Sequence, residues 1–423
     1  MAQSDPLLSM HDIDGEDMNI HKGMPQTGTS LLSGVSLPAA AIFEVPLAHN
    51  LAWMQRFADA HHARFAPHGK TTMAPALFKR QLEAGAWGIT LATAPQCRAA
   101  FAHGVKRLLL ANQLIGAANM AIIAELIEAG ADFYCVVDSA ANVQALGHFF
   151  AERNLQLNVL IELGVAGGRC GCRTQEQATD LAQMIDAEPA LRLAGIEGYE
   201  GVVHGETQGD DPVVAIRDYA GSLVEIAQAL HRDGLISVSD PIITASGSAW
   251  YDLIAEAFDE VQLREVFTPV LRPGCYVVHD HGLYHEAQQG VLSRRSDLQE
   301  GLLPALEVFA QVQSLPEPGL AIVALGKRDI GGDRLPIPLR RYREGNRREA
   351  GLVDETLAVS GWEVFKLMDQ HAFIRLPEDV EDVQVGDIVA FGASHPCLTF
   401  DKWRRLCLVD EALNVKEVIE TVF

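Results

Sequence analysis

Residues 108–137, LLLANQLIGAANMAIIAELIEAGADFYCVV, decide the fold of this chain. The segment opens with an apolar run at 108–111 and continues through a stretch at 120–129 whose apolar residues recur at helical spacing. Ala129-Gly130 follows, and a glycine at that point is typical of a helix C-cap. A second β-rich run occupies 133–137. The segment therefore predicts a strand, a helix and a second strand.

The same alternation extends in both directions from this segment. Short β-rich runs occur at 64–66, 88–92, 108–111, 133–137, 157–162, 193–196, 242–245 and 267–271. Helical stretches such as 178–185 and 219–232 separate them. Eight strands separated by helices predict an α/β fold with a (β/α)8 barrel, and a doubly wound open sheet is the alternative. No GxGxxG follows the first strand, which argues against a dinucleotide-binding fold.

Changes in sequence texture divide the 423 residues into three regions. Residues 1–34 are polar and acidic and predict a flexible N-terminal extension. Residues 35–275 carry the predicted barrel. Beyond them the long helical patterns mostly disappear, and short runs predict a separate β-rich domain over 276–423, with strands at 276–279, 321–324, 358–359, 363–367, 372–374 and 387–391.

Composition and charge exclude several classes of protein. Hydrophobic residues make up 48% and charged residues 21%, which is ordinary for a globular chain and excludes global disorder. The 33 basic and 56 acidic residues give a formal net charge of -23, which argues against nucleic acid or an anionic membrane as a partner. A basic island runs from Arg340 to Arg348; we interpret it as a solvated loop, with an anion contact as the alternative.

Targeting signals and disulfide frameworks are not evident. The N-terminal residues lack a basic region followed by an apolar core, and no apolar run reaches about 18 residues without charge, so we expect neither a secretory signal nor a transmembrane helix. The seven cysteines are scattered and odd in number, which favours free thiols in a reduced, cytoplasmic protein.

The first candidate for chemistry is Lys70, in Pro67-His68-Gly69-Lys70-Thr71-Thr72 directly after the first predicted strand. Active sites of barrels gather at the C-terminal ends of the strands. A lysine there with a lowered pKa can form a Schiff base, whereas an ordinary lysine is a solvated surface group.

Two glycine-containing turns follow the last two strands of the predicted barrel. Ser246 and Gly247 lie after the seventh strand, and Gly274 and Cys275 after the eighth. Loops at these positions are the usual phosphate cradle of the fold, because backbone N–H groups and hydroxyls can converge there. Two tight turns without a ligand are the alternative.

Other polar residues follow the middle strands. Arg169, after the fifth strand, suits a phenolate or carboxylate oxygen, while the neighbouring Cys170 and Cys172 are either structural thiols or half of a soft-metal site. Tyr199, after the sixth strand, is a core aromatic or a cofactor contact. His371, in the β-rich region, is a core histidine or one that supports a site.

His395-Pro396-Cys397 is the candidate for a metal. In an extended segment residues i and i+2 point the same way, so the imidazole and the thiolate would face one point. Both groups suit Zn²⁺. A turn with a buried thiol is the alternative.

Taken together, these motifs resemble the D-threonine aldolase/D-serine dehydratase family of pyridoxal-phosphate enzymes. The resemblance covers roughly residues 38–410 and rests on the segments 67–71, 82–89, 110–113, 168–171, 272–276 and 395–397, in the family's order. It implies an alanine-racemase-like barrel with a β domain, a homodimer, and pyridoxal 5'-phosphate with a divalent metal, Zn²⁺ being favoured over Mn²⁺ or Mg²⁺.

The resemblance also implies roles for individual residues. Lys70 corresponds to the lysine that holds pyridoxal phosphate covalently, Arg169 to the arginine beside the phenolic oxygen and Tyr199 to a tyrosine near the ring. The turns at Ser246-Gly247 and Gly274-Cys275 correspond to the phosphate site. His395 and Cys397 correspond to the metal pair.

The reaction expected from the resemblance is dehydration of a D-3-hydroxy amino acid of the D-serine or D-threonine type, giving a 2-oxo acid and ammonia. Cys397 favours this branch, since the aldolase branch tends to have His-x-Asp. The alternative is retro-aldol cleavage to glycine and an aldehyde, with His371 as the base near the metal. Racemisation and a non-catalytic cofactor carrier are further hypotheses on the same scaffold.

Overall fold

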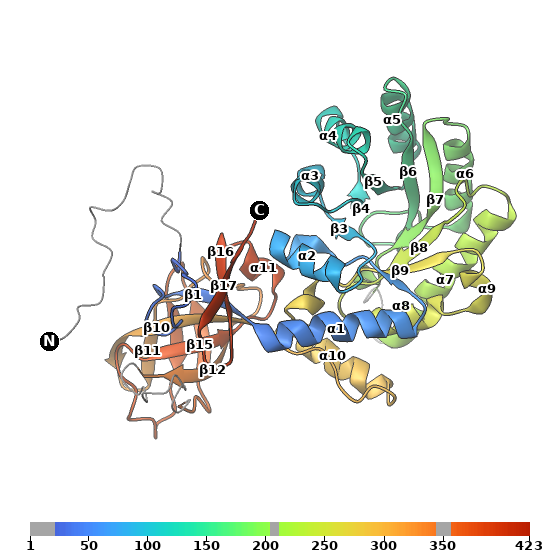
Figure 1. Ribbon diagram of the computed structural model, residues 1–423. Helices are drawn as coiled ribbons and strands as arrows, with labels where there is room; N and C mark the ends of the chain where they lie inside the picture. The colour runs from blue at the N-terminus through green and yellow to red at the C-terminus, as the bar shows by residue number, and fades with distance from the viewer. Residues whose placement is uncertain (1–21, 204–210, 344–356) are drawn as a thin grey trace, which may run out of the picture.

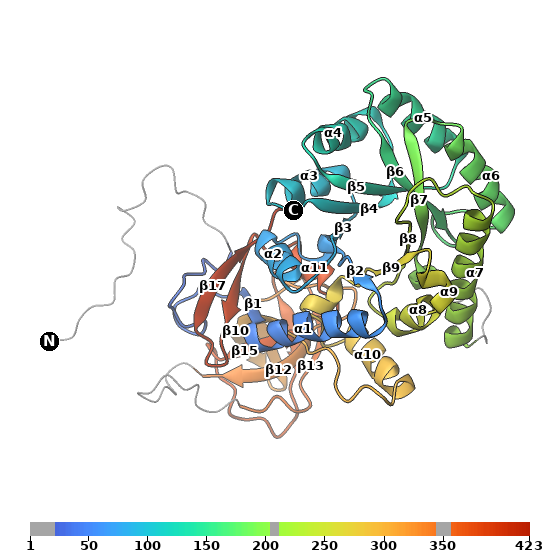
Figure 2. The same cartoon turned by 45° about the vertical axis from the view of Figure 1, so that its right-hand side comes forward.

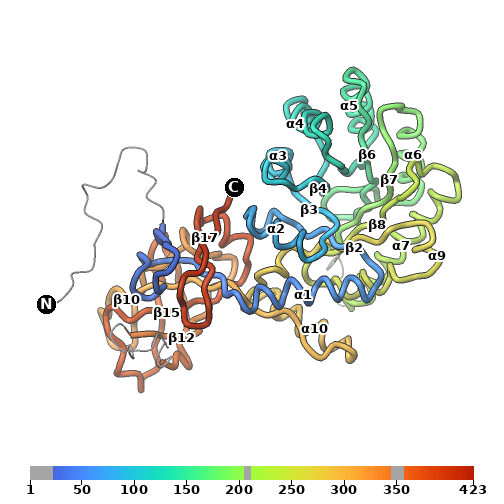
Figure 3. Tube along the Cα trace, in the orientation of Figure 1, coloured from blue at the N-terminus to red at the C-terminus, as the bar shows by residue number. Residues whose placement is uncertain are grey.

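The computed structural model describes residues 22–203, 211–343 and 357–423, and these form two parts that lie side by side (Figure 1). One part is a barrel with helices around it, and the other consists mostly of strands. The chain passes from the β part into the barrel through α1 (Glu44–Ala60), and α10 (Leu283–Arg294) follows the barrel on the way back (Figure 3).

The barrel contains the eight strands that the sequence predicts. They are β2 (Arg64–Phe65), β3 (Ile89–Leu91), β4 (Arg107–Gln113), β5 (Asp132–Val137), β6 (Leu157–Leu163), β7 (Leu191–Gly198), β8 (Ile242–Ala245) and β9 (Thr268–Leu271). They pair in parallel in the order β2-β9-β8-β7-β6-β5-β4-β3. The N–H of Trp87 donates to the carbonyl of Phe65 (2.7 Å) and that of Thr90 to the carbonyl of Pro67 (2.9 Å), so backbone hydrogen bonds link β3 to the β2 segment and close the ring. The alanine-racemase-like barrel is confirmed.

Helices surround these strands, as Figure 2 shows for α3 to α7. The remaining helices of the barrel region are α2 (Pro75–Glu83), α3 (Ala94–Ala102), α4 (Ala117–Glu128), α5 (Ala140–Ala151), α6 (Gln175–Asp186), α7 (Pro212–Arg232), α8 (Tyr251–Phe258) and α9 (Val261–Arg264), with short 3-10 turns η1 (Gly69–Thr71), η2 (Glu200–Val202) and η3 (Cys275–Val277). Gly85, Gly130 and Gly234 follow α2, α4 and α7 with positive φ, which confirms the C-caps expected from the sequence.

The β part is built around one long strand. Its strands are β1 (Ala39–Phe43), β10 (Leu306–Glu317), β11 (Leu320–Val323), β12 (Ile337–Tyr342), β13 (Glu363–Leu367), β14 (Ala372–Arg375), β15 (Ile388–Gly392), β16 (Arg405–Val409) and β17 (Val415–Glu420), and α11 (Cys397–Phe400) precedes β16. β10 pairs with β1, β11 and β15, so the sheet branches at this strand.

Three segments differ from what the sequence suggests. β1, inside the predicted barrel region, joins the β sheet between β10 and β16. Residues 22–34, expected in the flexible extension, pack on the same sheet: Leu31 is fully buried, and its N–H donates to the carbonyl of Leu413 (2.8 Å). The apolar cluster around Leu31 explains this order, because removing it from water stabilises the segment. Residues 276–279, expected as a strand, begin with the 3-10 turn η3 and continue without strand pairing.

The two parts share one apolar core and touch through polar contacts. The largest cluster of buried hydrophobic residues runs from the barrel into the β sheet. Arg80 of α2 pairs with Glu417 of β17 at 2.6 Å. Within the described residues no helix is both long and apolar enough to cross a membrane.

Candidate active site

A cavity of about 230 Å³ lies where the ends of the barrel strands meet the β part. Nine of the ten residues that were assigned a role in the predicted active site line it: Lys70, Arg169, Tyr199, Ser246, Gly247, Gly274, Cys275, His395 and Cys397. They come from six separate loops, and the last two come from the β part. The fold thus brings together residues as far apart in sequence as 70 and 397.

Lys70 lies in η1, which follows β2 after three residues. Gly69 makes this turn possible, because a Cβ there would lie 2.8 Å from the side chains of both Ile89 and Phe78. Desolvation by the surrounding protein lowers the pKa of Lys70. A larger fraction of neutral amine is available at a given pH, which is the form that attacks a carbonyl or accepts a proton.

Arg169 and Tyr199 form one wall of the cavity. The guanidinium carbon of Arg169 lies 4.8 Å from the centre of the Tyr199 ring, within the range of a cation–π contact. The ring is held between two glycines, since a Cβ at Gly201 would lie 2.3 Å from it and one at Gly247 2.9 Å. Among the described residues Arg169 forms no ion pair, so its charge is available to an anionic ligand.

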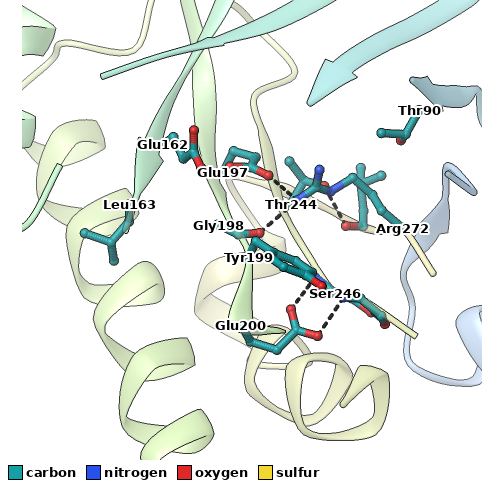
Figure 4. Close-up of polar contacts among 12 residues, drawn as sticks. Thr90, Glu162, Leu163, Glu197, Gly198, Tyr199, Glu200, Thr244, Ser246 and Arg272 are labelled. Atoms are coloured by element: carbon teal, nitrogen blue, oxygen red, sulfur yellow. Dashed lines mark hydrogen bonds and ion pairs between the residues drawn. The ribbon is translucent and has the colours of Figure 1, made fainter. Parts of the chain in front are cut away.

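The two predicted phosphate turns differ in their hydrogen bonds. The N–H groups of Ser246 and Gly247 donate to the buried carboxylate of Glu200 at 3.1 and 2.6 Å (Figure 4). The N–H groups of Gly274 and Cys275 both donate to the hydroxyl oxygen of Ser248, at 3.2 and 3.1 Å. A phosphate oxygen is the same kind of acceptor as that hydroxyl. The second turn therefore fits an anion, whereas the backbone of the first turn is committed to Glu200.

A buried group of charges lies behind Arg272. Its guanidinium donates to Glu197 and to the carbonyl of Gly198, the latter at 2.8 Å (Figure 4). Glu162 lies beside Glu197 on the neighbouring strand, and desolvation together with the charge of Glu197 raises the pKa of Glu162 to about 7. The sequence motif around Gly274 includes Arg272, but its acidic partners carry no local signal.

The predicted metal pair, His395 and Cys397, lies in the cavity beside Cys275. The Sγ atoms of Cys275 and Cys397 are 3.6 Å apart, and the donor atoms of these two cysteines and His395 all lie within 4.8 Å of one another. Nδ1 of His395 contacts Oδ2 of Asp333 at 2.9 Å, which leaves Nε2 for a ligand. Asp333 was not evident from the sequence.

Hydrogen bonding adjusts the protonation of this group. Hydrogen bonds from Cys275 and His395 lower the pKa of Cys397 well below its usual range, while contact with Cys397 and Asp333 raises the pKa of His395 to about 9. Burial raises the pKa of Cys275. One thiolate is therefore favoured in the cluster, and thiolates are strong ligands for soft metals.

The prediction that His395 and Cys397 converge along an extended segment is wrong. Pro396 has helical dihedral angles (φ -59, ψ -40), and Cys397 begins α11, so the segment is not extended. The two side chains converge through a turn and not through alternation along a strand. Thr71 supports the pair, since its Oγ1 lies 3.4 Å from Sγ of Cys397.

Three other sequence candidates lie apart from the cavity. His371 is exposed in the turn between β13 and β14, where its carbonyl accepts from Met368 N–H (2.8 Å), so the expectation that it serves the site is not met. Cys170 and Cys172 follow Arg169 and do not line the cavity; the donor atoms of Cys170, Asp138 and Glu162 lie within 4.8 Å of one another.

The described part of the basic island is structural. Arg341 is buried and pairs with Asp382 and Asp387, each at 2.7 Å, while Arg340 pairs with Glu307. These acidic partners neutralise the arginines, which leaves little charge for an external anion. Residues 344–348 of the island lie outside the described residues.

Comparisons with known proteins agree with this arrangement. The family described as "Alanine racemase, N-terminal domain" matches residues 46–263, and the family described as "Putative serine dehydratase domain" matches residues 305–409. The chain is 24% identical to a D-threonine aldolase of Arthrobacter sp over 383 residues, 90% of this chain and 91% of that protein. It is 30% identical to a D-threo-3-hydroxyaspartate dehydratase of Delftia sp. (strain HT23) over 247 residues, 57% of this chain and 61% of that one.

Solved structures give the same fold. A D-threonine aldolase from Filomicrobium marinum superposes with a TM-score of 0.77 at 20% identity, covering 94% of this chain and 98% of that one. The likeness extends over both the barrel and the β part.

Proposed function

Because the chain belongs to the family of the alanine racemase N-terminal domain, which matches residues 46–263 of its 423, we propose that it is a pyridoxal-phosphate- and metal-dependent lyase of D-3-hydroxy amino acids. We propose dehydration as its reaction, giving a 2-oxo acid and ammonia. One observation carries the proposal: the Lys70 amine and the sulfur and imidazole donors of His395 and Cys397 line one cavity.

The residues of the cavity fit pyridoxal phosphate. Lys70 would hold it covalently, Arg169 offers a charge without a carboxylate partner among the described residues, and the Gly274-Cys275 turn offers two N–H groups to an acceptor oxygen. When bound, this cofactor stabilises negative charge at the α-carbon of an amino acid. The Tyr199 ring provides an apolar wall against which a planar ligand can pack.

The donor set at His395 and Cys397 fits a divalent metal. An imidazole nitrogen and a thiolate suit Zn²⁺, and Asp333 orients the imidazole in the way that carboxylates support histidine ligands in metal sites. A metal held there supplies a Lewis acid for the β-hydroxyl, which is otherwise a poor leaving group.

The chain's own residues account for substrate handling. Because its surroundings lower the pKa of Lys70, the neutral amine can accept the α-proton, which is the base the reaction needs. Arg272 keeps its guanidinium fixed against Glu197 and Gly198, which leaves Arg169 as the guanidinium of the cavity that can pair with an incoming anion. Departure of the β-hydroxyl then gives an enamine, which hydrolyses to the 2-oxo acid and ammonia.

A second candidate is retro-aldol cleavage to glycine and an aldehyde. The names of two similar proteins favour this reaction. A D-threonine aldolase aligns in sequence with 90% of the chain, and a solved D-threonine aldolase superposes on 94% of it. That reaction needs a base to take the proton of the β-hydroxyl. His371, the residue expected for that role, is exposed in a turn and does not line the cavity, and this supports dehydration.

A substrate panel separates the two reactions. D- and L-3-hydroxy amino acids are assayed for ammonia and 2-oxo acid, and for glycine and aldehyde, with and without a chelator. We expect ammonia from D-substrates only, lost with chelator and restored by Zn²⁺. If the products are glycine and an aldehyde, the chain is an aldolase and the dehydratase proposal is wrong. Full activity of the metal-free protein would refute the metal requirement.

Replacement of Lys70 tests the catalytic base. Lys70→Ala should remove the visible absorbance of the bound cofactor and lower turnover by about 10²-fold to 10⁴-fold. Lys79→Ala is the matched control, because Lys79 is an exposed lysine of α2 that pairs only with Glu83 at 3.8 Å among its charged neighbours in the described chain. Retained turnover in Lys70→Ala would contradict the assignment.

A further inference from the structure

The metal pair expected from the sequence has a third donor beside it. Cys275 lies in η3 at the end of the barrel, and its side chain is only 3% exposed. Its Sγ lies 3.6 Å from Sγ of Cys397, and the donor atoms of Cys275, His395 and Cys397 lie within 4.8 Å of one another. We propose that Cys275 is a third protein ligand, so that the ion is held by two thiolates and one imidazole and is zinc. This inference rests on the proposed function for the presence of a metal.

The separation of the sulfurs agrees with such a site. Two thiolates at about 2.3 Å from one tetrahedral Zn²⁺ lie about 3.8 Å apart. The 3.6 Å between Cys275 and Cys397 is within 0.2 Å of that value. A bound dication also deprotonates a coordinating thiol, so a thiol buried beside it becomes a ligand without any other base.

The surroundings hold the three donors in place. Nδ1 of His395 is bound to Asp333, and Oγ1 of Thr71 lies 3.4 Å from Sγ of Cys397 and 3.9 Å from Sγ of Cys275. The Gly274 turn packs closely on the Lys70 loop, because a Cβ at Gly274 would lie 2.6 Å from the carbonyl of His68. That close approach fixes where the Cys275 side chain begins.

The backbone and the side chain of Cys275 then have separate roles. Its N–H shares the Ser248 hydroxyl with the N–H of Gly274, at the part of the turn that fits an anion. Its sulfur instead faces the metal donors. The sequence-based assignment of Cys275 to cofactor binding therefore applies to the backbone, and the side chain remains free to bind the ion.

Three consequences follow from this ligand set. Three protein ligands leave a fourth position open to the cavity, which is the arrangement of catalytic rather than structural zinc. Thiolates select zinc over magnesium or manganese, which prefer oxygen ligands. Since Cys275 belongs to the barrel and the other two ligands to the β part, the ion would also join the two parts of the molecule.

The first test is X-ray absorption at the zinc edge of the purified holoenzyme loaded with one equivalent of Zn²⁺. We expect two sulfur and two nitrogen or oxygen neighbours, with sulfur at about 2.3 Å. One sulfur and three lighter neighbours would overturn the inference. This measurement needs no variant, so a folding defect cannot obscure it.

Variants give an independent test. In the Co²⁺-loaded protein the intensity of the sulfur-to-metal charge-transfer band follows the number of thiolates. We expect Cys275→Ser and Cys397→Ser each to halve this intensity. Each variant should also bind Zn²⁺ about 10-fold to 100-fold more weakly, as measured by competition with a chromogenic chelator. Cys407→Ser is the control and should leave both readings unchanged, because Cys407 is a buried cysteine of β16 that does not line the cavity.

These readings do not depend on turnover, so the two proposals fail separately. Full charge-transfer intensity and unchanged zinc affinity in Cys275→Ser would refute the third ligand even if the holoenzyme is an active lyase. Two sulfur neighbours in a protein that turns over no D-3-hydroxy amino acid would refute the proposed function and leave the ligand set standing. A wild-type chain that binds no zinc would overturn both the metal and the third ligand.

Discussion

The carboxyl group of Glu162 should make the stability of the barrel depend on pH. Glu162 and Glu197 are register partners on β6 and β7, and both are buried. Among the described residues Arg272 forms an ion pair with Glu197 and none with Glu162, so one of the two carboxylates has a paired cation and the other does not. Gln113 donates to Oε2 of Glu162 at 2.6 Å, which leaves the other oxygen to carry a proton. Glu162→Gln keeps the size of the side chain and removes the charge.

The size of the effect follows from the pKa. Desolvation and the charge of Glu197 raise the pKa of Glu162 from 4.5 to about 7 in the folded chain. A raised carboxyl pKa means that the folded state binds the proton more tightly, so its stabilising contribution is complete below about pH 4.5 and is lost as the pH rises through 7. At about 1.4 kcal/mol for each pH unit, the whole effect is on the order of 3 kcal/mol, of which about 2 kcal/mol falls between pH 5.5 and 8.

The assay is the free energy of unfolding in urea, followed by tryptophan fluorescence at pH 5.5, 6.5, 7.5 and 8. This range stays above the sequence pI of about 5.0, where low net charge favours precipitation. Relative to wild type, Glu162→Gln should gain about 2 kcal/mol between pH 5.5 and 8. Glu83→Gln, at an exposed position of α2, is the control and should follow wild type.

The reasoning would be refuted by parallel curves. If wild type and Glu162→Gln change by the same amount across this range, within about 0.5 kcal/mol, then Glu162 is ionised in the folded chain throughout. A wild-type stability that rises from pH 5.5 to 8 while that of the variant stays flat would reverse the sign and would equally contradict the raised pKa.

Four further substitutions test how the chain packs. Leu31→Ala should lower the free energy of unfolding by about 2–4 kcal/mol in a urea titration, because Leu31 is fully buried against the β sheet; no loss would mean that residues 22–34 do not pack there. Gly195→Ala should lower the free energy of unfolding by about 3 kcal/mol or more in the same titration, since φ is +141° and a Cβ would lie 1.8 Å from a carbonyl of β8. Gly221→Ala in α7, which has open space around it, should instead raise the free energy of unfolding by roughly 0.5–1 kcal/mol. Arg341→Met should cost about 3 kcal/mol in thermal unfolding, because the buried carboxylate of Asp387 loses a partner; an unchanged melting temperature would show that the pair contributes nothing.

The barrel could be predicted because its signals are local. A strand such as β6 is covered on both faces, so it reads as a nearly continuous apolar run. Several helices end at a glycine that takes a positive φ, as at Gly130 after α4. Both signals lie within about ten residues of sequence, and neither depends on a distant partner.

The β sheet depends on partners that are far apart, and this is why much of it was missed. β1 pairs in parallel with β16, so that Ala41 lies beside Cys407. Nothing in residues 39–43 distinguishes a strand of this sheet from a first strand of the barrel. β10 contains two irregularities in its pairing with β11, which interrupt the alternation of apolar and polar residues that would mark a strand.

The site shows the same division between local and distant information. His395 and Cys397 form a recognisable local pair, but Asp333, which orients the imidazole, lies 62 positions earlier in the chain. His371 has the right chemistry for a base, yet the turn between β13 and β14 carries it into solvent. Residue type indicates what a side chain can do, while the pairing of the strands decides where it is.

Cys275 illustrates why a motif identifies a backbone more securely than a side chain. The glycine before it identifies a turn after the last barrel strand, and the pairing of β9 with β2 places that turn against the Lys70 loop. Only glycine at 274 permits the contact, because a Cβ would lie 2.6 Å from the His68 carbonyl and 2.7 Å from Oγ1 of Thr71. Because the barrel occupies one side of the turn, the side chain of Cys275 points to the other side, where Sγ of Cys397 in the β part lies 3.6 Å away. The proposed ligand set, which is shared between the two parts, would therefore be a property of their packing, and no sequence motif in either part alone contains it.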